Sequence, residues 1–232
     1  MAVIQGATSL VGADVGATTL ALKVSSAPTE YGAYGYYRYA SKSGTLAVQL
    51  AAAGLVFAFR WGDPSVLALL TSLKVRMQGN VAFTAAAANL SLAAFIGRSY
   101  NASHTGGTAA TVTGNNLKLR TSFPTSKIAT NGDIRISTTA ALGGGTITLD
   151  TQPFAYGGPG RANIVNAVAA TEYLVSTQPG SIDWRCDVAG GEHPLVLAQN
   201  EGIVIANQVV WPAAGTAEVT VELAWAEVAA YP

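Results

Sequence analysis

The segment AEVTVELAW, residues 217–225, decides the fold class. In it, two glutamates and a threonine alternate with four apolar residues, Val219, Val221, Leu223 and Trp225. A period of two is typical of a β-strand that buries one face and exposes the other to water. The segment therefore predicts a half-buried strand whose tryptophan points into the core.

The residues upstream predict a partner for this strand. Ile203, Ile205 and Trp211 share one parity, and Pro212–Gly215 supplies the turn residues for a hairpin return. Both tryptophans, Trp211 and Trp225, are then expected in one core. Before them, Leu195 and Leu197 predict a short strand. It closes with the sequence Asn-Glu-Gly at 200–202, where we expect the glycine to supply the positive φ of a tight connection.

Alternating patterns recur along most of the chain. They predict further strands at 55–61, 73–77, 90–96, 117–120, 133–137 and 146–150. The polar, glycine-rich stretch 99–116 predicts a surface loop, and 164–175 fits either a helix or a long strand. Repeated short strands at this spacing indicate an all-β sandwich or barrel.

Charge narrows the possible partners. The 232 residues include 13 basic and 13 acidic ones, so the chain has no net charge at pH 7 and offers no electrostatic surface for nucleic acid or an anionic membrane. Only 11% of its residues are charged, against roughly 25% in ordinary soluble domains. A surface so poor in charge favours association, and we expect copies of the chain or a larger assembly to cover much of it.

The N-terminal sequence lacks the basic region and the continuous apolar core of a signal peptide. The apolar stretches 45–59 and 81–96 are too short or too interrupted by polar residues to span a membrane. With a single cysteine, Cys186, an internal disulfide is impossible. We therefore expect a soluble protein.

The chain divides into an extended N-terminal arm, residues 1–30, and a β-sandwich domain, residues 31–232. The arm has scattered apolar residues that we expect to contact a neighbouring subunit or the larger assembly: Val3, Ile4, Leu10 and Val11. A tyrosine-rich segment follows and supplies further candidate contacts, because tyrosine suits interfaces: Tyr31, Tyr34, Tyr36, Tyr37 and Tyr39. The segment also fits a strand packed across a sheet edge, and a ligand-binding aromatic patch is the alternative.

Residue types that carry chemistry are sparse. The closest grouping of metal-ligand types is Cys186, Asp187, Glu192 and His193, which lacks the paired spacing of a structural zinc site. The other histidine, His104, lies in the predicted loop far along the chain, without a nucleophile motif. The sequence thus predicts no catalytic residue, no metal site and no cofactor.

Five blocks of sequence, taken in order, resemble a group of tailed-bacteriophage virion proteins: GTLAVQLAAAGLVFAFRWGD, GGTAATVTGNNLKLRTSF, DIRISTTAALGGGTITLDTQP, HPLVLAQNEGIVI and AAGTAEVTVELAWAEV. The resemblance runs from about Gly35 to Tyr231 and is weaker over the arm. It implies a jelly-roll-like antiparallel β-sandwich that serves as a head decoration or cement protein and stands as a homotrimer on the capsid. Its partner would be the major capsid protein, and its location the capsid surface of a virion assembled in a bacterial host.

A second class of function stays open beside this one. The sandwich would also suit a receptor- or glycan-binding module of a phage fibre or tail. In that case the loops around 101–104 and 157–160 would form the binding site, with Tyr100 and Tyr156 as their aromatic residues.

Overall fold

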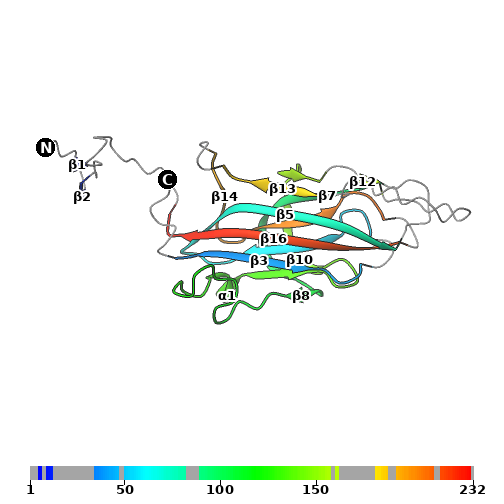
Figure 1. The fold of residues 1–232 in the computed structure, drawn as a ribbon, viewed down its shortest axis with the longest axis horizontal. Helices are drawn as coiled ribbons and strands as arrows, with labels where there is room; N and C mark the ends of the chain where they lie inside the picture. The colour runs from blue at the N-terminus through cyan, green and yellow to red at the C-terminus, as the bar shows by residue number, and fades with distance from the viewer. Residues whose placement is uncertain are drawn as a thin grey trace, which may run out of the picture.

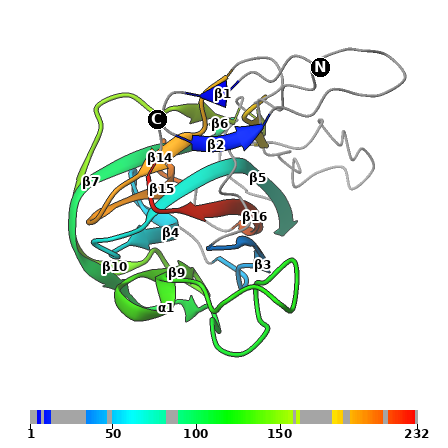
Figure 2. The same cartoon turned by 90° about the vertical axis from the view of Figure 1, so that its left-hand side faces the viewer.

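The chain forms a sandwich of two antiparallel β-sheets (Figures 1 and 2). The computed structural model describes residues 5–6, 9–12, 34–46, 50–81, 89–157, 160–161, 181–187, 192–211 and 215–230. Figure 2 shows β5, β16 and β3 in one layer, with β15, β4 and β9 in the layer beside it. The expected all-β sandwich is confirmed.

One sheet has five strands: β3 (Tyr36–Lys42), β5 (Leu67–Val81), β13 (Ile182–Arg185), β14 (Leu195–Leu197) and β16 (Thr216–Val228). The other has seven: β4 (Leu55–Trp61), β7 (Leu92–Thr105), β8 (Thr108–Ala109), β9 (Asp133–Ile136), β10 (Gly143–Leu149), β11 (Ala155–Tyr156) and β15 (Glu201–Asn207). A single helical turn, α1 (Ile128–Asn131), precedes β9. Two further pairs are β1 (Gln5–Gly6) with β2 (Ser9–Gly12), and β6 (Asn89–Leu90) with β12 (Gly160–Arg161).

Strand pairing is nested along the chain. Strand β3 pairs with β16, β4 with β15, β5 with both β13 and β14, and β7 with β10. Strands β3, β4, β5 and β7 alternate between the two sheets, as do β14, β15 and β16, whereas β7 to β11 stay in the seven-stranded sheet. The predicted hairpin between residues 203–211 and 217–225 is therefore wrong, because β15 and β16 lie in different sheets.

The space between the sheets is filled by the apolar residues that set the period of two. Trp61, Trp211 and Trp225 are fully buried in one cluster, which confirms the expected common core. The ring of Trp225 stacks on Tyr37, with centroids 5.5 Å apart, and meets Phe59 edge-on at 5.3 Å. These contacts join β16 and β3 of one sheet to β4 of the other.

Several predicted strands are confirmed, and the predictions for residues 99–105 and 117–120 are wrong. The structure has strands at 55–61, 67–81, 92–105, 133–136, 143–149 and 195–197. Residues 99–105, expected in a loop, continue β7, because β10 pairs with them through backbone hydrogen bonds. Residues 117–120 form no strand, since Leu117 has φ 68° and only an isolated bridge links Lys118 to Tyr37. Residues 164–175 lie outside the described residues.

The turn before β15 has a different basis from the one expected. Asn200, not Gly202, has the positive φ, at 60°. Gly202 is required by close packing instead, because a Cβ atom there would lie 2.1 Å from the carbonyl oxygen of Phe59.

The tyrosine-rich segment divides between core and surface. Tyr37 is 0% exposed and Tyr39 is 5% exposed, so both are core residues with no surface for a partner. Tyr34 and Tyr36 are partly exposed, and Tyr31 lies outside the described residues. The expectation that this segment contacts a partner therefore rests on Tyr34 and Tyr36.

Only a small part of the N-terminal arm, residues 1–30, lies within the described residues. Val3 and Ile4 lie outside the described residues, and Leu10 and Val11 belong to β2, whose backbone pairs with β1. The contacts expected of these four residues stay predictions.

Candidate interaction surface

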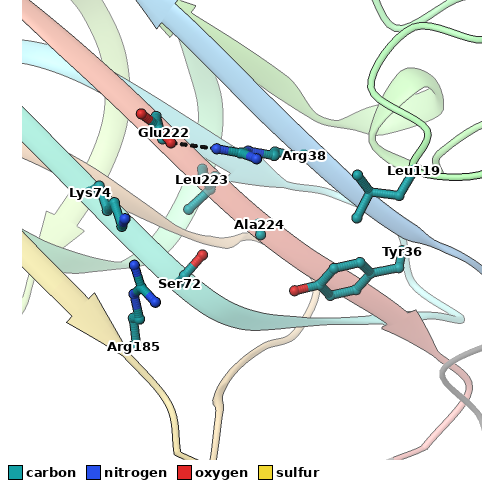
Figure 3. A pocket seen from close by; sticks show the side chains of 9 residues that line it. All are labelled: Tyr36, Arg38, Ser72, Lys74, Leu119, Arg185, Glu222, Leu223 and Ala224. Atoms are coloured by element: carbon teal, nitrogen blue, oxygen red, sulfur yellow. Dashed lines mark hydrogen bonds and ion pairs between the residues drawn. The ribbon is translucent and has the colours of Figure 1, made fainter.

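A groove on the outer face of the five-stranded sheet is lined by charged, polar and apolar side chains (Figure 3). It crosses β3, β16, β5 and β13, and a loop that follows β8 forms part of one wall. We call it the sheet-face groove. Its lining residues are Tyr36, Arg38, Ser72, Lys74, Leu119, Arg185, Glu222, Leu223 and Ala224.

Strand register explains why the sheet is hollowed here. Arg38 pairs with Ala224, Ala224 with Ser72, and Ser72 with Arg185, so these four residues form one row across the sheet. Side chains in such a row project from the same face. The two central residues, Ala224 and Ser72, are small, whereas Arg38 and Arg185 at the two ends have long side chains. The surface is therefore hollow between the two arginines.

Not every charged side chain in the groove has a partner of opposite charge. The Arg38 guanidinium lies 2.5 Å from the Glu222 carboxylate, and the Arg185 guanidinium lies 3.3 Å from Asp183. Lys74 stands in register between Glu222 and Asp183, yet it makes no ion pair within the part of the chain that the structure describes. In Figure 3 the charged ends of the Lys74 and Arg185 side chains point toward each other, whereas the Ser72 hydroxyl points toward Ala224. One end of the groove is therefore cationic.

The excess of positive charge extends along the outer face of this sheet. Five cationic side chains, those of Arg38, Lys42, Lys74, Arg76 and Arg185, share it with three carboxylates, those of Glu218, Glu222 and Asp183. A hydrogen bond from Lys42 lowers the pKa of Glu218, so this carboxylate stays ionised. A chain with no net charge thus concentrates cations on one face.

The other end of the groove is apolar. Leu119 is 50% exposed and lies beside Tyr36, since its backbone N–H donates to the Tyr36 carbonyl oxygen at 3.2 Å. The Tyr36 hydroxyl meets the Thr71 hydroxyl at 2.6 Å. Tyr36 also packs against an outer-face cluster whose central residues, Leu69 and Val228, are buried.

A buried carboxylate, Glu227, holds the loop that carries Leu119. It accepts hydrogen bonds from the Ser126 hydroxyl at 2.5 Å, from the Lys127 N–H at 3.0 Å and from the Trp225 indole at 3.2 Å. Burial raises the pKa of Glu227 to about 7, against these hydrogen bonds. Sequence reasoning missed this residue, although it continues the inward parity of Val219 to Trp225.

The residues with metal-ligand side chains near His193 contact one another within a loop. The Cys186 thiol lies 3.4 Å from the Glu192 carbonyl oxygen, and the Asp187 N–H donates to the Glu192 carboxylate at 2.8 Å. Burial raises the pKa of the Cys186 thiol, and Glu192 and Asp187 raise it further. His193 is exposed. No group of three or more potential metal ligands occurs among the described residues.

The region expected to bind glycans is largely strand. Residues 101–104 lie in β7 and pair with β10. Tyr100 and His104 are buried with their rings 5.4 Å apart, and the His104 Nδ1 lies 2.8 Å from the Gly144 carbonyl oxygen. Tyr156 is 52% exposed, and of 157–160 only the ends are described. The two expected aromatic residues therefore do not form one exposed site.

Within the described ranges, no helix has the length and apolar character needed to cross a membrane. Searches against protein-family models, curated proteins and solved structures gave no match for this chain.

Proposed function

We propose that the chain is a non-enzymatic virion structural protein, a decoration or cement protein that binds on a capsid and bridges its major subunits. The observation that carries the proposal is the presence of apolar clusters on the outer faces of both sheets. Antiparallel sheets in a free-standing sandwich normally present polar residues outward. An outward apolar cluster is expected where another protein covers it.

On the seven-stranded sheet, the outward cluster contains the buried residues Ala58 and Val204. Phe95, Ile147 and Leu149 pack against it and stay partly exposed. Their neighbours in sequence, such as Phe57 and Ile203, point into the core instead. The five-stranded sheet has the second outward cluster, in which Leu69, Ala226 and Val228 are buried and Tyr36, Leu67 and Val196 stay partly exposed. Both faces thus offer apolar surface for contacts with copies of the chain or with a capsid.

The low charged fraction of 11% supports the same proposal, because a free surface is usually kept soluble by charge. Closed homo-oligomers bury such surface, and we propose a homotrimer. In a cement protein the stabilising effect comes from binding across neighbouring subunits, so no catalytic group is needed.

The nested strand pairing supports a jelly roll as part of the proposal, since pairing of early strands with late ones is the connectivity of that fold. Jelly rolls serve both viral capsids and lectins. The fold alone therefore does not choose between a cement protein and a glycan-binding fibre module. The sheet-face groove, with a tyrosine on its wall, is the observation that keeps the fibre module as the second candidate.

Copy number tests the first proposal against the second. Quantitative mass spectrometry of purified virions that contain this protein would compare it with their major capsid protein. A cement protein is expected in hundreds of copies per particle. A few dozen copies or fewer would contradict that role and favour the fibre module.

Light scattering tests the oligomer with a matched pair of variants. Ile147 belongs to the outward cluster, whereas its neighbour Thr148 is exposed and outside it. Ile147→Glu should shift a trimer toward monomers, and Thr148→Glu should not, with thermal melts confirming that both variants fold. A wild-type chain that is monodisperse and monomeric at micromolar concentration would contradict the trimer.

A further inference from the structure

We infer that the sheet-face groove binds an acidic segment of a different protein, and that a carboxylate of that partner lies between Lys74 and Arg185, beside Ser72. This inference concerns the chemistry of the groove and holds for a virion protein of either class. It rests on three observations: an unmatched cation, the convergence of two cations, and an apolar wall at a fixed place beside them.

Lys74 is the unmatched cation. Its cross-strand neighbours on β16 and β13 are the carboxylates Glu222 and Asp183. Each of those carboxylates is already engaged by an arginine, Arg38 or Arg185. Among the described residues, no carboxylate is left to Lys74. The groove therefore has a place for one negative charge from outside.

Convergence of Lys74 with Arg185 locates that place. Both side chains come from neighbouring strands, and their charged ends point toward each other beside Ser72 (Figure 3). Two like charges held near each other repel, and a carboxylate between them removes the repulsion while accepting charge-assisted hydrogen bonds. Charge complementarity thus identifies an acidic ligand.

The apolar end indicates that this ligand is a protein segment. Across the small floor residue Ala224, the wall is formed by Tyr36 and by the exposed side chain of Leu119. An extended segment places alternate side chains on one side, so an acidic residue and an apolar residue two positions away can fill both ends at once. An inorganic anion or a simple acidic sugar would use only the cationic end.

The partner is a different protein rather than a second copy. Among the described residues, the carboxylates of this chain are mostly engaged already: those of Asp133, Asp150, Asp183, Glu201, Glu218 and Glu222 form ion pairs, and that of Glu227 is buried. A protein with alternating acidic and apolar residues supplies what the groove lacks.

Binding of short peptides to the full chain tests the inference. The probe is a labelled peptide of alternating glutamate and leucine, and its control has glutamine in place of glutamate. Fluorescence anisotropy should show binding of the acidic peptide alone, weakening as salt is added. Backbone NMR shifts should change at residues 72, 74 and 185.

Three variants locate the site. Lys74→Gln and Arg185→Gln should each weaken binding about three- to fivefold, as expected for exposed ion pairs. Lys42→Gln removes the same charge from the same sheet face, outside the groove, and should leave binding within about twofold. Thermal melts check that each variant is folded.

Three results would overturn the inference. One is equal binding of the glutamate and glutamine peptides. Another is an equal effect of the Lys42 and Lys74 variants, which would show a nonspecific response to surface charge. The third is binding of a free acidic sugar, lost in the Lys74 and Arg185 variants while the peptide does not bind, since this would assign the groove to a glycan.

Discussion

The indole N–H of Trp225 donates a hydrogen bond, 3.2 Å long, to the carboxylate of Glu227 on the same strand. Both side chains point inward from β16, and both are fully buried. One of them fills the aromatic core, and the other holds Ser126 and Lys127 of the loop that shapes the sheet-face groove. Core packing and the surface site are thus connected through two residues.

Replacing Glu227 should change how stability depends on pH. The pKa of its carboxyl is about 7 in the folded chain, chiefly because of burial, and its ordinary value is 4.5. A group whose pKa is raised by folding contributes stability that is complete below the ordinary value and is lost as pH rises through the folded value. The wild-type chain should therefore lose ~3 kcal/mol of unfolding free energy between about pH 4.5 and 7.5 from this group.

Thermal melts across that pH range provide the test. Glu227→Gln should flatten the fall in Tm with rising pH. Glu218→Gln is the control, because its pKa is lowered and it titrates below this range. An unchanged pH slope in the Glu227 variant would show that another group causes the fall.

Trp225→Ala should be strongly destabilising, by about 3 to 5 kcal/mol, because it removes a fully buried ring that contacts Tyr37 and Phe59. Trp225→Phe should cost less, since an aromatic ring stays while the hydrogen bond to Glu227 is lost. Tyr156→Ala is the exposed control and should change stability by less than about 0.5 kcal/mol. Urea denaturation measures all three, and equal losses for Trp225 and Tyr156 would contradict the buried position.

Gly202→Ala should be among the most damaging small substitutions. The added Cβ would lie 2.1 Å from the Phe59 carbonyl oxygen and 2.8 Å from the Tyr100 ring, so β15 and β4 would have to separate. Gly79→Ala meets nothing within 4 Å and serves as the control. Its stability should stay within about 1 kcal/mol of wild type. A Gly202 variant as stable as the Gly79 variant would show that the sheets adjust without cost.

Strands can be predicted from the sequence where burial of one face imposes a period of two. They cannot be predicted where only backbone pairing holds the strand. Residues 55–61 alternate because one face packs in the core, and their strand was predicted. Residues 99–105 are mostly polar, yet they form a strand because β10 supplies hydrogen-bond partners. Composition could not reveal that pairing, since its two strands lie about forty positions apart in sequence.

The sequence predicts which side chains of single strands face solvent in the groove, but not which strands lie side by side. The alternating pattern predicts that Lys74 faces solvent, because Leu73 and Val75 on either side of it in sequence face the core. Which strands lie beside it depends on long-range pairing, for example between Arg38 and Glu222, 184 positions apart. The same limit explains Tyr37 and Tyr39, because a period of two shows that they share a face without showing that this face is the core.

Deleting residues 1–28 should leave the sandwich folded and weaken its association. In the described part of this region, β1 and β2 pair only with each other, and the core cluster begins at Tyr37. An extended segment gains backbone hydrogen bonds by adding to the exposed sheet edge of a neighbour, which would join subunits or attach the protein to a capsid. A cooperative melt of the truncated chain would confirm folding, and light scattering and binding to particles that lack the protein would measure association. If the truncated chain assembles and binds as well as the full chain, attachment must run through the sandwich itself, with Tyr34 and Tyr36 as the first residues to replace.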